Sequence, residues 1–163
     1  MDWSERNYGV IPLSQASALP GIAFLRNLIA GAYPDPPISR QLTFRLVEVE
    51  EGFAVFEGET GPHLLNPLGG VHGGWALTLI DSACAVAAHS TLPPGKAHAT
   101  IETKANLSRP IRAETGLVRC EGRVVTAGRT IISSEAKVLD AAGKVLAHGT
   151  STIMVIEAPP SAA

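Results

Sequence analysis

The chain has 163 residues, of which 45% are hydrophobic and 17% charged, and its net charge is −2 at pH 7. This length and composition predict one folded domain with a sizeable core and exclude a disordered chain. The nearly neutral charge gives no reason to expect nucleic acid or an acidic membrane surface as a partner. So few charges on a domain of this size indicate that part of its surface is buried against another subunit.

The ends and the cysteines indicate a cytoplasmic protein. The first ten residues carry two acids and no apolar run, which excludes a signal peptide. The longest apolar run, residues 74–88, is too short for a membrane span and contains Asp81. Cys84 and Cys120 lie in apolar or alternating segments, so we expect both to be reduced core residues.

Residues 1–39 are predicted to form an N-terminal helix and a linker. Apolar residues recur at helical spacing after Pro20, and Gly31 is placed to end this helix. The segment YPDPPIS, residues 33–39, is so rich in proline that we expect a turn or linker without regular structure. The positions with helical spacing are Ile22, Leu25, Leu28 and Ile29.

Residues 40–156 are predicted to form the main domain. Residues 41–49 and 52–58 alternate between apolar and polar and predict a hairpin, and residues 73–90 predict a long helix. Four strands follow, joined by short connections as an antiparallel meander. In the first of them, alternation places one set of residues on a single face: Ile101, Thr103, Ala105 and Leu107.

The resulting fold class is α+β, with a sheet of about five to six strands wrapped around one central helix. Because this helix is apolar nearly all round, we expect it to be buried on nearly all sides, in part by a second copy of the chain. Residues 157–163 are expected to be a disordered tail.

Glycines crowd the start of the long helix around His72. A helix N-terminus offers free N–H groups and a partial positive charge, and glycines leave them uncovered, which suits an oxyanion site. The alternative is a glycine-rich turn before a tightly packed helix. No Lys-Ser/Thr follows, so this is not a phosphate-binding loop. The glycines are Gly69, Gly70, Gly73 and Gly74.

Asp81 lies within this apolar helix, where an ionised carboxylate is costly unless it has a partner. A hydroxyl of Ser82 or Thr78 or a wet edge would satisfy it, or else it serves as a general base or nucleophile. Gly73 and Asp81 are eight residues apart, about 12 Å along a helix, so one small carbonyl group cannot contact both. Two antiparallel helices about a two-fold axis would bring them together in two shared sites.

The pattern of Asn66, His72-Gly73-Gly74 and Asp81 resembles the hotdog-fold acyl-CoA thioesterases of the phenylacetate-degradation (PaaI) type. The segments at 100–110, 128–130 and 147–150 are similar as well, so the resemblance covers roughly residues 40–156. It implies a hotdog fold with an extra N-terminal helix, homodimers paired into homotetramers, and hydrolysis of an acyl-CoA thioester.

The resemblance also implies a role for each matching residue. The Gly73 N–H polarises the thioester carbonyl, Asn66 assists it, and Asp81 of the other subunit activates water or attacks directly. Thr100 orients Asp81 or the water. For His72, which belongs to the matching pattern, the residues favour fixing the loop or packing near the site over acting as a base. No metal or cofactor is expected, because coenzyme A is part of the substrate and the histidines lack ligand spacing. The candidate contacts for the CoA phosphates are Arg109, Arg112, Arg129 and Lys104.

Two other functions fit the same fold. One is a non-catalytic acyl-CoA-binding protein, as in hotdog regulators, although residues 1–39 lack the basic patch of a DNA-binding segment and Asp81 is retained. The other is a hotdog dehydratase or hydratase, whose His–acid motif is not found in this sequence. Trp75 stands where relatives carry a smaller aliphatic residue, and it either narrows the acyl pocket or packs in the core.

Overall fold

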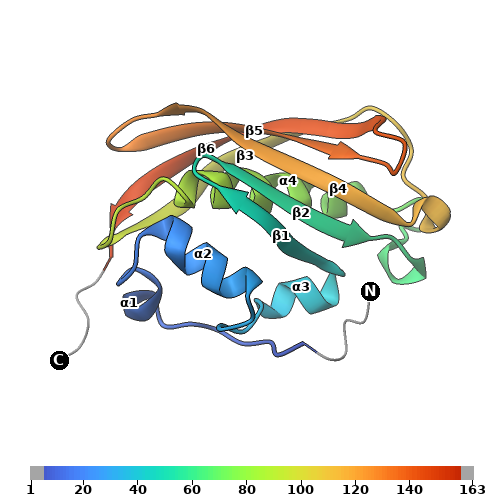
Figure 1. Ribbon diagram of the computed structural model, residues 1–163. Helices are drawn as coiled ribbons and strands as arrows, with labels where there is room; N and C mark the ends of the chain where they lie inside the picture. The colour runs from blue at the N-terminus through green and yellow to red at the C-terminus, as the bar shows by residue number, and fades with distance from the viewer. Residues whose placement is uncertain (1–5, 159–163) are drawn as a thin grey trace.

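The computed structural model describes residues 6–158, in which one curved antiparallel sheet wraps around a long central helix (Figure 1). The helix is α4 (Gly73–His89), and the strand order across the sheet is β1-β2-β4-β5-β6-β3. The predicted α+β architecture is therefore confirmed. The strands are β1 (Phe44–Glu50), β2 (Phe53–Glu59), β3 (Lys96–Leu107), β4 (Leu117–Ala127), β5 (Ile131–Leu139) and β6 (Val145–Glu157).

The first two strands form the predicted hairpin. Gly52 supplies the positive φ of 74° that the tight turn requires, and its N–H donates to the Ser90 hydroxyl at 2.8 Å. Strand β1 begins at Phe44 rather than at residue 41, because Thr43 has a positive φ of 48°, which no extended strand accommodates.

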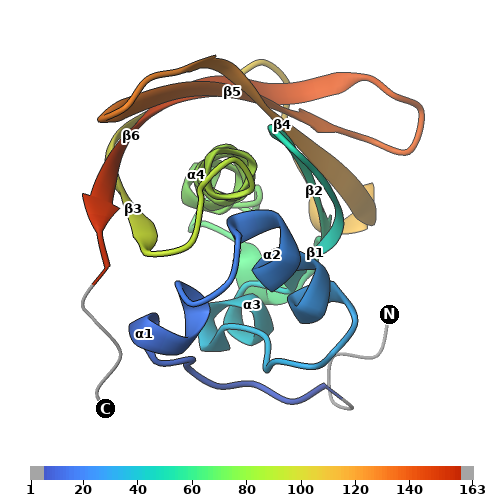
Figure 2. The same cartoon turned by 60° about the vertical axis from the view of Figure 1, so that its left-hand side comes forward.

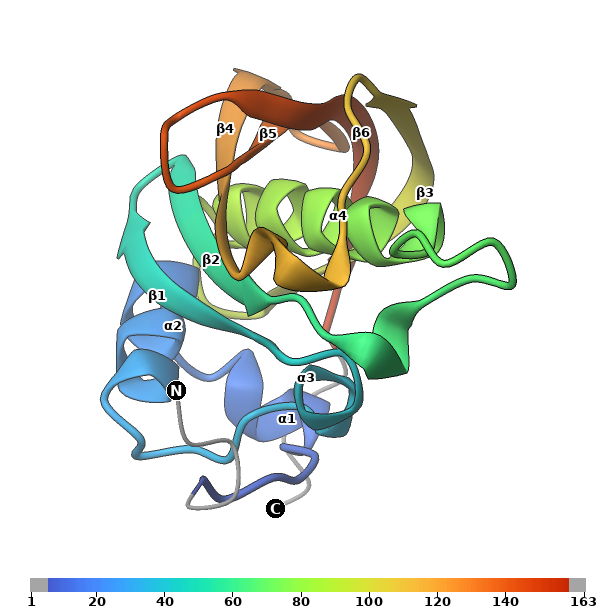
Figure 3. The ribbon, with the colours of Figure 1, turned by 90° about the vertical axis from the view of Figure 1, so that its right-hand side faces the viewer.

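The last four strands do not form the predicted meander, because the first two of them, β3 and β4, are not neighbours in the sheet. β3 pairs with β6, whereas β4 pairs with β2 and β5. The link of residues 108–116 passes the start of α4, where the Val71 N–H donates to the Ile111 carbonyl at 3.0 Å, and reaches the other side of the sheet (Figure 3). As a result, the twelve-residue β3 is an edge strand.

The predicted alternation of β3 is interrupted by a β-bulge between Thr100 and Glu102. Ile101 is 56% exposed, so its predicted place on one face with Thr103 and Ala105 is wrong. Thr103 and Ala105 do face α4, and Leu107 lies beside Gly73, although its side chain is 57% exposed. A bulge shifts the alternation by one residue, which the sequence pattern alone does not reveal.

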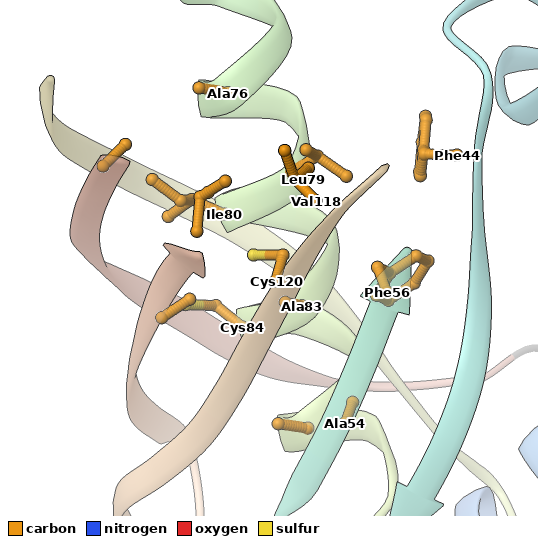
Figure 4. Packing of buried hydrophobic residues seen from close by; sticks show 14 of the residues in the cluster. Phe44, Ala54, Phe56, Ala76, Leu79, Ile80, Ala83, Cys84, Val118 and Cys120 are labelled. Atoms are coloured by element: carbon orange, nitrogen blue, oxygen red, sulfur yellow. The ribbon is translucent and has the colours of Figure 1, made fainter. Parts of the chain in front are cut away.

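Ten of the 17 residues of α4 are buried, and its inner face packs on the sheet. Figure 4 shows Leu79 and Cys84 of α4 packed near Cys120 of β4. Both cysteines are free and buried, as predicted, and burial raises the pKa of the Cys84 thiol to about 12. Gly122 of β4 allows this packing, because a Cβ there would lie 2.3 Å from the Ala83 carbonyl oxygen.

Trp75 packs in the core rather than in a ligand pocket. Its side chain is 3% exposed, and its Nε1–H donates to the Leu42 carbonyl at 2.7 Å. The ring lies so close to β2 that a Cβ at Gly58 would come within 2.8 Å of it. Of the two alternatives for Trp75, the structure supports core packing.

Three N-terminal helices lie on the side of α4 that the sheet leaves open, and one of them, α2, contacts it (Figure 2). They are α1 (Leu13–Ala16), α2 (Gly21–Ile29) and α3 (Pro37–Gln41). Helix α2 confirms the predicted helix, which ends before Gly31 with its φ of 77°.

The prediction that residues 33–39 contain no regular structure is wrong. Helix α3 begins with Pro37 in its first turn, where the missing N–H would have no helical partner in any case. At the other end, Glu157 belongs to β6, and residues 159–163 of the predicted tail lie outside the described residues. No helix within residues 6–158 is long and apolar enough to cross a membrane.

Candidate active site

His72 caps the start of α4, as predicted for a residue that fixes the loop. Its Nδ1 accepts a hydrogen bond from the Gly74 N–H at 2.9 Å, and its carbonyl accepts from the Trp75 N–H at 2.9 Å. Within residues 6–158 the intervening Gly73 N–H has no hydrogen-bond partner. The helix therefore begins with a free donor at the positive end of its dipole.

Asn66 shapes the loop that precedes this helix. Its Oδ1 accepts from the Leu68 N–H at 2.9 Å and from the Gly70 N–H at 3.3 Å, and these bonds fix the orientation of the amide. The Nδ2 group has no partner in the described part of the chain, and it would lie 3.6 Å from a Cβ at Gly70. A second free donor thus lies in the same loop.

The two donors line one cavity of about 330 Å³, called here the donor cavity. Its walls come from the glycine loop, the start of α4 and the link that follows β3. Residues named from the sequence that border it are Asn66, Gly73 and Arg109, so the structure brings these three together.

Asp81 is half-buried on α4 and is held by Thr103, whose hydroxyl donates to Asp81 Oδ1 at 2.8 Å. Thr103 also hydrogen-bonds the Ser151 hydroxyl at 2.9 Å, which ties the carboxylate to β6. The alternative partner Thr78 donates instead to the Gly74 carbonyl at 2.9 Å. Sequence reasoning missed Thr103 as the partner of Asp81, although it had placed Thr103 on one face of its strand with Ala105 and Leu107.

Asp81 lines a second cavity of about 250 Å³, called here the carboxylate cavity. The predicted Thr100 borders it, as do His98 and Val86, and the N-terminal helices form its opposite wall. Thr100 therefore lies in the right compartment, and its role in orienting Asp81 or water stays a prediction.

The donor cavity and the carboxylate cavity share no lining residue. Gly73 and Asp81 belong to one continuous helix and are eight residues apart, which corresponds to about 12 Å along its axis. In the described part of the chain, Gly73 and Asp81 therefore do not line a common cavity.

The four basic candidates for CoA do not cluster in one chain. Arg109 lines the donor cavity, and Arg112 precedes the 3₁₀ turn Ala113–Thr115 nearby. Arg129 lies in the β4–β5 turn. Ile131, just after this turn, pairs with Met154, and Met154 lies beside the start of β3. The turn is therefore near the C-terminal end of α4, away from the donor cavity. Lys104 follows Thr103 on β3 and so points away from α4.

Sequence analysis did not predict the contact between His89, at the end of α4, and His98 of β3. Their Nδ1 atoms are 3.1 Å apart. Burial lowers the pKa of His89 to about 4, and it also lowers the pKa of His98, against the opposing effect of Asp81. Both rings are therefore neutral near pH 7. Within residues 6–158 no three His, Cys, Asp or Glu side chains gather in a way that could hold a metal ion.

Residues 68–147 match the family model described as Thioesterase superfamily. A curated relative, the 1,4-dihydroxy-2-naphthoyl-CoA hydrolase of Listeria monocytogenes serotype 1/2a (strain 10403S), is 26% identical over 118 residues. The alignment covers 72% of this chain and 94% of the relative.

Solved structures are similar over most of their length. A phenylacetic acid degradation-related protein from Ralstonia eutropha JMP134 has a TM-score of 0.72 and 26% identity, covering 80% of this chain and 98% of its own. A conserved protein from Pseudomonas aeruginosa has a TM-score of 0.69 and 31% identity, covering 74% and 94%. A protein from Streptococcus mutans UA159, solved bound to acetyl-CoA, has a TM-score of 0.64 and 27% identity, covering 71% and 90%.

Proposed function

Since the chain belongs to the thioesterase superfamily and has the hotdog fold, we propose that it hydrolyses acyl-CoA thioesters at two sites shared between the subunits of a homodimer. One observation carries the proposal. The cavity lined by Gly73 and Asn66, whose donors are free, is separate from the cavity lined by Asp81. Gly73 and Asp81 are about 12 Å apart along α4. Two α4 helices packed antiparallel would place the donor cavity of each subunit against Asp81 of the other.

The surface of the single chain supports this pairing. The residues of α4 that are not fully buried include a stripe at helical spacing, namely Gly74, Leu77, Thr78 and Asp81, and Leu77 is 37% exposed. Beside it runs the long edge strand β3, with Ile101 exposed. An exposed apolar edge strand is a template for pairing with another strand, so a second copy would cover both features.

The chemistry follows from the groups in the two halves. The thioester oxygen accepts hydrogen bonds from the Gly73 N–H and the Asn66 amide, each worth about 10²–10³ in rate as negative charge develops on it. Asp81 takes a proton from water, which adds to the carbonyl carbon, or attacks that carbon itself. When water adds, the C–S bond then breaks, and CoA leaves as its thiol after taking up the proton that Asp81 removed, with the free acid as the other product. When Asp81 attacks, breaking of the C–S bond leaves a mixed anhydride on Asp81, and water hydrolyses this anhydride to the free acid and restores the carboxylate.

The basic residues fit a substrate that enters from the donor side. Arg109 lines the donor cavity and Arg112 follows its lining residue Ile111, so both would meet the phosphates of CoA there. In the antiparallel pair, Arg129 at the far end of each subunit would approach the donor cavity of the other. The bound acetyl-CoA of the Streptococcus mutans relative supports CoA as the carrier. Lys104, which points away from α4, is the least favoured of the four.

The test is release of free thiol from a panel of acyl-CoA substrates by the wild-type protein and by Asp81→Asn. We expect the variant to lose about 10²–10⁴-fold in turnover, because it lacks the base. Asp140→Asn is the matched control, since Asp140 lies in the exposed β5–β6 turn and an asparagine oxygen can still accept its two backbone hydrogen bonds. Binding of acyl-CoA without any turnover by the wild-type protein would instead assign the non-catalytic function.

A further inference from the structure

A third cavity of about 340 Å³ adjoins the carboxylate cavity and is called here the distal cavity. Its lining includes residues of α1, α2 and the end of α4. Figure 2 shows α1 and α2 on the side of α4 away from the sheet. Four residues line both cavities, so the two compartments adjoin at one junction. The shared residues are Leu28, Pro36, Val86 and His98.

Helix α4 forms a common wall along this path. Asp81 lies in the carboxylate cavity, Val86 at the junction and His89 in the distal cavity. From Asp81 to His89 the helix advances about 12 Å, at about 1.5 Å per residue. The path therefore begins at the proposed reacting carbon and leads away from the stripe that faces the second subunit.

The distal cavity is lined chiefly by apolar side chains, among them Phe24 and Leu25 of α2. His89 and His98 lie in its wall without charge near pH 7, because burial lowers the pKa of both. In the adjoining compartment the buried Asp35 forms an ion pair with Arg6. Such walls favour a hydrocarbon and give no charged partner for a polar group.

We propose that these two cavities bind the acyl group of the substrate as an extended, unbranched chain of about ten carbons. An extended chain advances about 1.2 Å per bond, so about ten bonds span the distance from Asp81 to His89. This inference rests on the proposed function and names the substrate class for it. Most of the distal wall comes from residues 9–37, outside the matched residues 68–147, so the selectivity belongs to the N-terminal segment of this chain.

The geometry disfavours two other classes of acyl group. A two- to four-carbon acyl group would end in the carboxylate cavity and leave the distal cavity unused. A rigid single-ring aryl group would likewise remain next to Asp81, because it cannot extend past the junction at Val86. Only a flexible chain uses both compartments.

The first experiment measures kcat/KM of the wild-type protein for acetyl-, butyryl-, octanoyl-, decanoyl-, benzoyl- and phenylacetyl-CoA. Each buried methylene can contribute up to about fourfold, so we expect decanoyl-CoA to exceed butyryl-CoA by about 10²–10³-fold, after the cost of ordering the chain. A flat chain-length profile, or aryl substrates hydrolysed faster than decanoyl-CoA, would overturn the inference. Neither result would affect the proposed function as long as hydrolysis still depends on Asp81.

The second experiment changes the junction. Val86→Phe should narrow it and lower the decanoyl-to-butyryl ratio of kcat/KM at least tenfold, whereas Val86→Ala should widen it and keep the preference for the longer chain. Val125→Phe is the matched control, because Val125 is 59% exposed on β4 and lines neither cavity. Thermal unfolding of each variant checks that it is folded. An unchanged ratio in folded Val86→Phe would show that the acyl chain does not pass this point.

Discussion

Thr103 on the edge strand β3 donates a 2.8 Å hydrogen bond to Asp81 on the central helix, and so holds the carboxylate in place. A hydrogen bond to a charged group contributes about 1.5–3 kcal/mol, and its loss frees the carboxylate to turn. Thr103→Val should therefore lower kcat about 10- to 100-fold with little change in KM, because Thr103 is a positioning residue. Thr103→Ser retains the hydroxyl and should restore most of kcat. Equal losses in both variants would contradict this role.

Sharing of the sites between subunits predicts complementation. Asn66→Ala removes a donor and Asp81→Asn removes the carboxylate, so each homodimer is impaired at both sites. A mixed dimer contains one intact site, and random exchange of equal amounts should restore about a quarter of the wild-type turnover. The measurement is thiol release after the two variants are unfolded and refolded together. Activity no higher than the average of the two separate variants would argue against shared sites.

The buried His89 predicts a loss of stability in acid. Its pKa is near 6.5 in the unfolded chain and about 4 in the folded protein, so the unfolded state binds more protons between these values. The free energy of unfolding should be constant above pH 6.5 on this account and fall by about 3 kcal/mol as the pH drops to 4. Urea unfolding of the wild type and of His89→Phe measures the effect. The variant should show a shallower acid decline, and an equal slope would exclude His89 as its source.

Gly122 predicts a local limit on side-chain size. A Cβ at this position would lie 2.3 Å from the Ala83 carbonyl oxygen, which belongs to the backbone of α4 and cannot move alone. Gly122→Ala should therefore cost about 1–3 kcal/mol and lower Tm. Gly70→Ala serves as the control, because its nearest neighbour would be 3.6 Å away. A Tm for Gly122→Ala equal to that of the control would contradict the close packing of helix and sheet.

Local periodicity was enough to predict α4, α2 and the β1–β2 hairpin. These elements depend on apolar spacing and on a turn glycine such as Gly52, both of which are readable within a short window. Helix α3 was not predicted because a proline-rich segment indicates a turn or linker. Proline is nevertheless favoured in the first turn of a helix, where Pro37 lies.

The pairing of strands far apart in the sequence could not be predicted from such short windows. The place of β3 at the sheet edge depends on the path of residues 108–116, and the bulge at Ile101 depends on its register with β6. The sequence pattern therefore predicted the helix that carries Gly73 and Asp81, but not the partner hydroxyl of Thr103. It likewise missed the contact of His89 with His98, because a helix end and a strand start meet there only in three dimensions.

A straight helix keeps Gly73 and Asp81 about 12 Å apart, so a lone subunit cannot present both groups to one carbonyl. Under the shared-site arrangement, a newly synthesised chain is inert toward thioesters until it meets a second copy. Specific activity should then decline on dilution below the dissociation constant of the dimer, and recover when the protein is concentrated again.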